Sequence, residues 1–341
     1  MRLIKTKDAV GQVLIHDITQ IIRGVTKDVR FSKGHVIAEE DIPVLLRMGK
    51  DHVYIWENDE SMLHENDAAE ILRGICQGEH MLASLPKEGK IELKAGCDGL
   101  FMVDTGRLRA LNSLGDMMIA TRVSGFPVKK GDKLCGTRVI PLVISKEKMK
   151  LAQSMAGDDP LLKLLPLKQK KYGLISTGNE IFHDRIRDEF SPVIKEKMAE
   201  YNCGLISHRV LDDSHEKITA AIKEILHLGA DIVICTGGMS VDPDDNTPQA
   251  IRNAALSVVS YGAPVLPGAM FMLAYTDDGR PVCGLPGCVM YAGRTVFDLV
   301  LPFMLADVKV TAEWLAGLGN GGLCLSCTDC HFPNCSFGKG V

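Results

Sequence analysis

The sequence lacks the basic surplus that a nucleic-acid-binding surface requires. Its 39 Lys and Arg residues are outnumbered by 43 Asp and Glu residues, which gives a formal net charge of −4. A protein that binds along a phosphate backbone needs excess positive charge to neutralise it. We therefore expect no nucleic-acid partner.

Long apolar runs are missing as well. The most apolar stretch, residues 289–306, is interrupted by Arg294, Asp298 and Pro302, so we expect no membrane-spanning segment and no membrane partner. The first eleven residues contain no apolar core of the kind that a secretory signal carries. Both features predict a cytoplasmic protein, in which the eleven cysteines are expected to stay mostly reduced or to bind metal.

Several common catalytic motifs are also absent. The chain has no G-x-x-x-x-G-K-[ST], no H-E-x-x-H and no G-x-S-x-G sequence, which argues against P-loop nucleotide hydrolysis, zinc proteolysis and serine-hydrolase chemistry. The glycine-rich run 317–322 neither follows a predicted strand nor precedes a predicted helix, so it is predicted to be a flexible linker. We expect His208 and His227 to be structural.

After residue 170, short apolar strands alternate with amphipathic helices. Strands are predicted at 172–176, 205–210 and 231–235, and helices at 191–202 and 213–228. Asp213 and Glu216 form a capping box that opens the second of these helices. A hairpin at 271–285 and a last helix at about 289–305 complete the series. This alternation predicts an α/β fold with three layers and a mostly parallel sheet.

The residues before 170 predict a smaller α+β region. Helices are expected at 39–48, 64–84 and 107–114, and a hairpin is expected to join strands 90–95 and 100–104. The predicted domains are a small α/β segment at 1–60, an α+β middle domain at 61–150, a linker at 151–170, the main domain at 171–306 and a flexible tail at 307–341.

Glycine and polar residues gather in the loops that follow the predicted parallel strands, and such loops meet at one edge of a sheet. Gly237 and Gly238 would let the backbone approach a phosphate closely. Thr247 would cap a helix whose N-terminus favours an anion. The candidate ligand-binding residues are Thr177, Gly178, Glu180, Thr236, Gly237, Gly238, Ser240, Asp242, Thr247, Pro286 and Gly287.

Four carboxylates, those of Glu180, Asp213, Asp242 and Asp245, belong to the same loops. Carboxylates beside a phosphate repel it unless a divalent cation bridges them, which predicts Mg²⁺. The alternative is that these residues only form turns and caps, because Asp, Asn, Gly and Pro are common there. The convergence of four such loops on one sheet edge favours a ligand site.

Five segments, at 176–180, 212–213, 236–248, 267–268 and 284–287, together resemble the molybdopterin-binding domain. Molybdopterin adenylyltransferases and molybdopterin molybdotransferases share that domain, and the resemblance covers about 170–306. It implies a small pterin ligand, molybdopterin or its adenylylated form, whose phosphate is held by the loop 236–238. It also implies that Asp245 is the family's functional aspartate and that Glu180 and Asp213 line the metal or nucleotide side.

The sequence departs from the molybdotransferases in two places. Those enzymes carry a β domain where this chain has residues 307–341, and their first loop continues to Asp-Thr-Asn where this chain has Asp188-Glu189-Phe190. Three functions therefore stay open. One is molybdate insertion with Asp213 and Asp245 as catalytic residues, and another is a non-catalytic carrier or sensor of the cofactor. The third is a nucleotide pyrophosphatase similar to the competence-damage-inducible family.

Self-association is common among relatives of this domain, so the resemblance implies a homo-oligomer. It also implies a molybdoenzyme or a biosynthetic protein as a partner.

The tail contains four clustered cysteines, at C-x2-C-x2-C-x4-C spacing. Four thiolates within twelve residues make a complete metal-ligand set, and the residues concerned are Cys324, Cys327, Cys330 and Cys335. Three cysteines within seven residues favour an iron–sulfur cluster, whereas zinc ribbons separate two pairs by a longer loop. Zinc, free thiols and a redox-active C-x-x-C pair remain alternatives.

Overall fold

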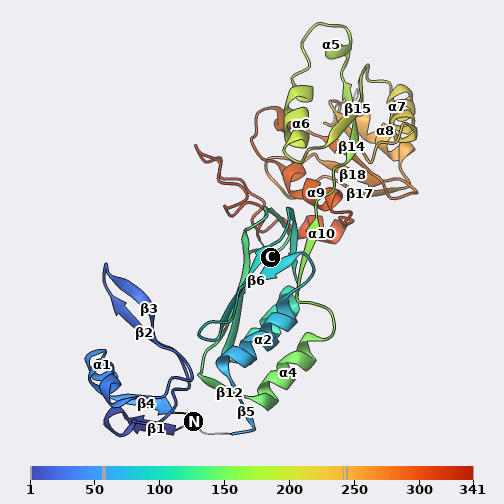
Figure 1. Ribbon diagram of the computed structural model, residues 1–341. Helices are drawn as coiled ribbons and strands as arrows, with labels where there is room; N and C mark the ends of the chain where they lie inside the picture. The colour runs from blue at the N-terminus through green and yellow to red at the C-terminus, as the bar shows by residue number, and fades with distance from the viewer. Residues whose placement is uncertain (1, 56–58, 241, 243–244, 341) are drawn as a thin grey trace. The chain divides into compact units, whose positions relative to one another are not determined.

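The structure is a computed structural model that describes residues 2–55, 59–240, 242 and 245–340. The chain divides into two compact units (Figure 1). The first comprises Met1–Cys97, Met102–Ser124 and Lys130–Leu164, and the second Asp98–Phe101, Gly125–Lys129 and Leu165–Val341. Within the described residues, no helix combines the length and the apolar character that a membrane crossing needs.

The N-terminal part of the first unit folds around a small core. Its elements are β1 (Arg2–Lys5), η1 (Thr6–Asp8), β2 (Ile18–Ile22), β3 (Thr26–Phe31), η2 (Glu39–Asp41), α1 (Ile42–Arg47) and β4 (His52–Ile55). Strand β1 pairs antiparallel with β4, and β2 pairs antiparallel with β3. Leu14, Phe31, Leu45 and Ile55 pack together in the core. The helix predicted at 39–48 is thus a 3₁₀ turn followed by a short α-helix.

The rest of the first unit is α+β. Its elements are β5 (Met62–His64), α2 (Glu65–Cys76), β6 (Met81–Ala83), β7 (Lys90–Ala95), α3 (Thr105–Asn112), β9 (Met117–Thr121), β11 (Lys133–Val139), β12 (Val143–Ser145) and α4 (Lys146–Ala156). Four strands form one sheet in the order β6-β7-β11-β9. The core residues Leu72 of α2 and Ile91 of β7 are fully buried.

Three expectations for residues 61–170 differ from the structure. The helix predicted at 64–84 stops at Cys76, and a Cβ on Gly78 would lie 2.3 Å from the Leu162 carbonyl oxygen. Strand β8 (Gly99–Val103) pairs with β10 (Phe126–Val128) rather than with β7, so the predicted hairpin does not form. The segment predicted as a linker contains the end of α4 and strand β13 (Leu162–Pro166).

The second unit contains a six-stranded mixed sheet in the order β15-β14-β16-β19-β18-β17. The strands are β14 (Lys171–Thr177), β15 (Gly204–Leu211), β16 (Ile232–Thr236), β17 (Ser257–Tyr261), β18 (Met272–Tyr275) and β19 (Pro281–Leu285). The first four strands of that order are parallel to one another, and β18 and β17 are antiparallel to their neighbours. The predicted α/β fold is confirmed, with β17 as an edge strand that the sequence did not reveal.

Helices lie on both faces of this sheet. The helices of the second unit are α5 (Asn179–Phe182), α6 (Phe190–Ala199), α7 (His215–His227), α8 (Thr247–Ala254), η3 (Gly287–Met290), α9 (Val296–Leu305) and α10 (Ala312–Gly317). Figure 1 shows α6 on one side of β14 and β15, with α7 and α8 on the other. Helix α7 lies so close to β14 that a Cβ on Gly173 would come within 2.1 Å of the Ile225 side chain.

The last helix predicted, at 289–305, is two elements in the structure. The 3₁₀ turn η3 ends at Met290, and α9 begins only at Val296. Thr295 caps α9 in a capping box with Asp298, and every residue of α9 is buried. The break includes Gly293 and Arg294, which interrupt the apolar stretch, and the sequence prediction continued the helix across them.

Candidate functional site

The candidate site lies where the order of the parallel strands changes direction. Strand β14 stands between β15 and β16, and the chain leaves β14 toward α6 on one face and β16 toward α8 on the other. Loops that diverge to opposite faces leave a crevice at the carboxyl ends of the strands, where ligands of open α/β sheets bind. The predicted site loops follow β14, β15, β16 and β19, as expected.

The loops after β14 and β16 are joined by buried threonines. The hydroxyl of Thr177 donates to the Thr236 carbonyl oxygen at 3.2 Å and lies 3.1 Å from the hydroxyl of Thr247. Gly237 has a φ of +86°, and a Cβ there would lie 2.1 Å from the Thr177 carbonyl oxygen. Gly238 also has a positive φ, of +53°. Only glycine fits this close approach, so these two residues are required for packing as well as for any contact with a phosphate.

Two helix caps differ from the sequence prediction. Helix α8 begins at Thr247 with Asn246 at the N-cap position, so Thr247 is a helical residue whose hydroxyl faces Thr177 instead of capping. Helix α7 is capped by Ser214, which accepts from Lys217 N, and not by Asp213. Short polar side chains at adjacent positions compete for the N-cap, and sequence alone does not decide between them.

Asp213 is therefore available to the site. Its carboxylate accepts a hydrogen bond from the Asn179 amide at 3.0 Å and joins the loop after β15 to the loop after β14. Partial burial, together with the negative charges of Glu180, Asp245 and Asp212, raises the pKa of the Asp213 carboxyl. The negative charges of Glu180 and Asp245 thus add to burial in disfavouring the ionisation of Asp213, and a bound cation would relieve this effect.

The motif at 236–248 is described in part, because residues 241 and 243–244 lie outside the described residues. Ser240 and Asp242 are exposed, and the Asp242 carbonyl oxygen accepts from the Asp245 amide at 3.0 Å. The hydroxyl of Tyr261 donates to the carbonyl oxygen of Met239 at 2.9 Å. Tyr261 thus holds this loop from β17, and the sequence pattern missed it because it missed that strand.

Pro286 and Gly287 lie where β19 turns into η3. Pro286 is buried and Gly287 is exposed. Pro286 lines a cavity of 510 Å³ together with Gly268 and the half-buried Cys288. Burial raises the pKa of the Cys288 thiol. The cavity therefore contains residues from two of the segments that carried the family resemblance, 267–268 and 284–287.

The segment that departs from the molybdotransferases forms a polar network. The Asp188 carboxylate accepts from the Phe190 and Ser191 amides at 2.9 and 3.0 Å and from the Ser176 hydroxyl at 2.7 Å. Burial opposes ionisation of Asp188, but the hydrogen bonds from Ser191 and Ser176 outweigh it and lower its pKa. His208 Nε2 lies 2.9 Å from the Ser191 hydroxyl oxygen. The network anchors the start of α6 to the end of β14.

The four tail cysteines line one cavity of 380 Å³. Cys327 and Cys330 are exposed, and Cys324 and Cys335 are half-buried. Across the part of the chain that the structure describes, no three His, Cys, Asp or Glu side chains are arranged as a metal-binding group. The predicted magnesium and tail metal sites therefore stay predictions.

Two protein families match separate parts of the chain. Residues 173–306 match the family described as "Probable molybdopterin binding domain", and residues 3–57 match a family described only as a domain of unknown function. The first match ends one residue after α9 and covers the six-stranded sheet from the third residue of β14 onward. The second match covers the N-terminal part of the first unit.

Curated relatives include two molybdopterin molybdenumtransferases. The one from Synechococcus elongatus is 22% identical over 196 residues, which are 54% of this chain and 46% of that protein. The one from Staphylococcus epidermidis is 21% identical over 310 residues, 83% of this chain and 71% of that protein. A CinA-like protein of Mycobacterium leprae is 27% identical over 79 residues, 23% of this chain and 18% of that protein. This chain thus spans about half the length of the first of these relatives.

Solved structures with a similar arrangement include the molybdopterin biosynthesis enzyme MoaB of Thermus thermophilus. It is 18% identical, covers 40% of this chain and 91% of that chain, and has a TM-score of 0.35. The order of the strands, the strand-end loops and the family match all concern the same part of the second unit. Residues 173–306 of this chain therefore belong to the family of probable molybdopterin binding domains.

Proposed function

We propose that this protein binds molybdopterin, or its adenylylated form, and inserts molybdate into it during molybdenum-cofactor biosynthesis. The observation that carries the proposal is the coincidence of the family match at 173–306 with the crevice between β14 and β16. The relatives named molybdopterin molybdenumtransferase support the same reaction. The sequence-based predictions of a cytoplasmic location, a homo-oligomer and a biosynthetic or molybdoenzyme partner belong to this proposal.

The pterin's phosphate would be held by the turn at Gly237 and Gly238. Both residues lack a side chain and have positive φ values, so their amides can approach an anion without obstruction. The helix α8 starts beside this turn, since the Thr247 amide donates to the Gly238 carbonyl oxygen at 3.3 Å. Its N-terminus favours an anion.

Mg²⁺ would be held by the carboxylates of Glu180, Asp213 and Asp245. Support comes from the raised pKa of Asp213, to which Glu180 and Asp245 contribute. A divalent ion supplies the positive charge that lets a phosphate lie beside carboxylates. Asp213 and Asp245 would orient the ion and the phosphate chain, and Asp213 is itself oriented by the Asn179 amide.

An Asp245→Asn substitution tests the catalytic role. We expect molybdopterin still to bind within a few-fold of wild type, because the side chain keeps its size, while molybdate insertion falls by about 10² or more. Asp277→Asn is the matched control, since Asp277 lies in the β18–β19 turn, at the opposite end of the parallel strands. Unchanged insertion by Asp245→Asn would reject the catalytic role and leave a carrier or sensor.

A second candidate function is nucleotide pyrophosphate hydrolysis. The relatives named CinA-like and competence-damage inducible favour it, although they cover at most 27% of this chain. The two functions differ in one respect that can be measured. A pyrophosphatase turns over an adenine dinucleotide without molybdate or pterin, whereas the proposed transferase does not.

The tail cysteines, Cys324, Cys327, Cys330 and Cys335, would bind an iron–sulfur cluster or zinc. Their location around one cavity supports this, and the thiols would lose their protons on binding. The protein should be purified without oxygen and assayed for iron, acid-labile sulfide and zinc. Near-stoichiometric iron with sulfide would identify an iron–sulfur cluster, and zinc alone would identify a zinc site. The absence of both metals would reject the site.

A further inference from the structure

The loop between β14 and α6, which carries α5, projects beyond the end of the sheet (Figure 1). It forms a cavity of 720 Å³, lined by residues between 181 and 188 and by Val210 of β15. This volume is typical of small-molecule sites. None of the lining residues belongs to the segments 176–180, 212–213 or 236–248. The cavity is therefore distinct from the strand-end loops assigned to the pterin.

Two arginines of this cavity have no partner in the protein. Arg185 and Arg187 are exposed, and within the described residues neither guanidinium forms an ion pair or a side-chain hydrogen bond. Arg209 on β15, by contrast, donates to Glu224 at 2.6 Å. A guanidinium binds phosphate or carboxylate oxygens through two parallel hydrogen bonds. Two unpaired guanidiniums in one cavity therefore favour an anionic ligand.

Two carboxylates line the same cavity, and they differ in what they contact. Asp188 accepts from the Ser176 hydroxyl and from the first two amides of α6, so its hydrogen-bonding capacity is already used. Asp184 is exposed, and within the described residues its carboxylate has no side-chain partner. A free carboxylate repels a phosphate but accepts hydrogen bonds from hydroxyl groups, as acidic side chains do from the ribose of dinucleotides. The free charged groups thus fit a ligand that carries both a phosphate and hydroxyls.

The remaining wall of the cavity is apolar. Phe182 is 42% exposed, Ile186 is 54% exposed and Val210 is 38% exposed. The Phe182 ring is oriented by His183, whose ring centroid lies 5.2 Å away, and by Lys217 Nζ, which lies 5.9 Å from the centre of the Phe182 ring. Exposed aromatic rings stack on nucleobases with little preference among the bases. The apolar wall therefore fits a flat aromatic group.

Hydrogen bonds to both ends of the loop hold the cavity in shape. At its start, the Arg185 and Ile186 amides donate to the Glu180 carbonyl oxygen at 2.9 and 3.2 Å, which folds the chain back onto α5. At its end, the bond from Ser176 to Asp188 attaches the loop to β14. A site that is formed before its ligand arrives loses less entropy on binding.

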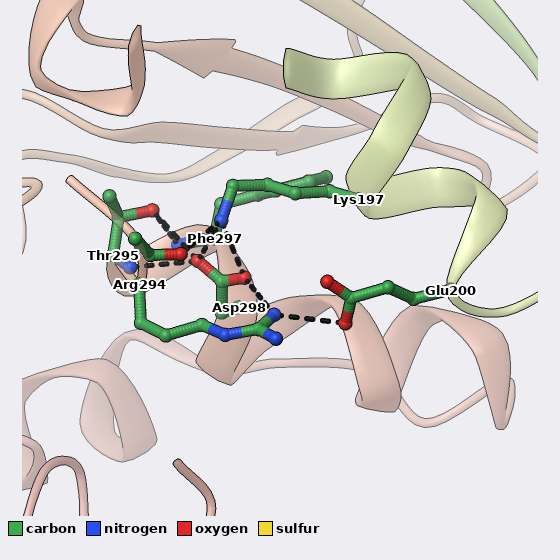
Figure 2. A network of polar contacts seen from close by, with 7 residues as sticks. Lys197, Glu200, Arg294, Thr295, Phe297 and Asp298 are labelled. Carbon is green, nitrogen blue, oxygen red and sulfur yellow. Dashed lines mark hydrogen bonds and ion pairs between the residues drawn. The ribbon is translucent and has the colours of Figure 1, made fainter. Parts of the chain in front are cut away.

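Helix α6, which follows the loop, is fixed in turn by a buried network (Figure 2). Lys197 of α6 donates to both Asp298 oxygens at 2.8 and 2.9 Å, and Arg294 donates to Asp298 at 2.9 Å and to Glu200 of α6 at 3.0 Å. The side chains of Lys197 and Asp298 are only 7% and 3% exposed. The network joins α6 to α9 and so supports the end of the loop.

We propose that the cavity at residues 181–188 binds a nucleoside monophosphate. The phosphate lies between the guanidiniums of Arg185 and Arg187, the ribose hydroxyls donate to Asp184, and the base stacks on the Phe182 ring. The site goes beyond the proposed function, because it uses none of the residues assigned to the pterin. It includes Asp188, where the sequence departs from the molybdotransferases.

The test measures binding of AMP, adenosine and inorganic phosphate to the full-length protein by titration calorimetry. The variants are Arg185→Gln/Arg187→Gln, which removes both free guanidiniums, and Phe182→Leu, which removes the ring. Arg209→Gln is the matched control, because Arg209 is an exposed arginine of β15 that is paired with Glu224 and lies outside the cavity. Urea titration of each variant checks that the unfolding midpoint is unchanged.

We expect wild type and Arg209→Gln to bind AMP with a dissociation constant below about 1 mM. The double arginine variant should bind AMP about tenfold or more weakly, because charge-assisted hydrogen bonds are lost. Phe182→Leu should bind AMP about fivefold or more weakly without a change in phosphate affinity. Adenosine and phosphate should each bind more weakly than AMP.

Two results would overturn the site. One is the absence of saturable AMP binding to wild type, and the other is equal AMP affinity in wild type and in the folded double arginine variant. Phosphate binding as tight as AMP binding, together with no effect of Phe182→Leu, would overturn the assignment to a nucleotide. None of these results depends on whether the protein binds molybdopterin.

Discussion

The ion pair between Lys197 and Asp298 leads to the most quantitative prediction. Asp298 accepts from Lys197, Arg294 and the Thr295 amide, and Lys197 Nζ is otherwise bonded to the Gly293 carbonyl oxygen at 2.8 Å. An Asp298→Ala substitution leaves a buried ammonium without its counter-charge. Removing one partner of a buried ion pair costs about 3–5 kcal/mol, so we expect the second unit to lose that much stability.

The fluorescence of a single tryptophan can report the loss of stability of the second unit. The chain has two tryptophans, and the ring of Trp314 lies 4.4 Å from that of Phe303 in α9. In a Trp56→Phe background, Trp314 fluorescence during urea titration reports on the second unit alone. Glu200→Gln is the control, because this partner of Arg294 is 45% exposed and its loss should cost less than about 1 kcal/mol.

The two variants separate a buried ion pair from a surface one. If Asp298→Ala and Glu200→Gln shift the unfolding midpoint equally, the pair does not carry the stability assigned to it. A Lys197→Met/Asp298→Ala double variant should be more stable than Asp298→Ala alone, because it removes the orphaned ammonium. A double variant that is less stable would also refute the reasoning.

Two further predictions concern the crevice. Gly237→Ala should destabilise the second unit by about 2 kcal/mol or more and abolish pterin binding, since its Cβ would meet the Thr177 carbonyl oxygen. Gly204→Ala, with open space and no positive φ, should be nearly neutral, and equal effects in urea titration would refute this packing argument. The pKa of the Asp213 carboxyl is higher in the folded protein than in the unfolded chain. The free energy of unfolding therefore falls as the pH rises from the unfolded-state pKa to the folded-state pKa. Asp213→Asn should remove that loss and raise the unfolding midpoint at pH 7, and a lower midpoint would contradict it.

The sequence predicted the parts of the fold that depend on periodicity. The alternation after residue 170 corresponds to strands β14, β15 and β16 and to helices α6 and α7. It failed at Gly78, where a tertiary contact with Leu162 decides and the packing partner is distant in sequence. It also failed at the break between η3 and α9, where the local signal, the capping box of Thr295 and Asp298, was not used.

The candidate site was predictable in composition but not in geometry. The sequence placed Glu180, Asp213 and Asp245 in loops at strand ends, and in the structure burial and the charges of Glu180 and Asp245 raise the pKa of the Asp213 carboxyl. It assigned the cap of α7 to Asp213 although Ser214 caps it, and it had no means of linking Tyr261 to the loop after β16. The adjacency of the tail cysteines to the 267–268 loop also depends on pairing between distant residues.

The most direct test of the central claim is mass spectrometry of the small molecule that copurifies with the full-length protein under anaerobic conditions. The account predicts molybdopterin or its adenylylated form in wild type and its loss in Gly237→Ala. A different ligand, such as an adenine dinucleotide without a pterin, or the same amount of pterin in Gly237→Ala, would contradict it.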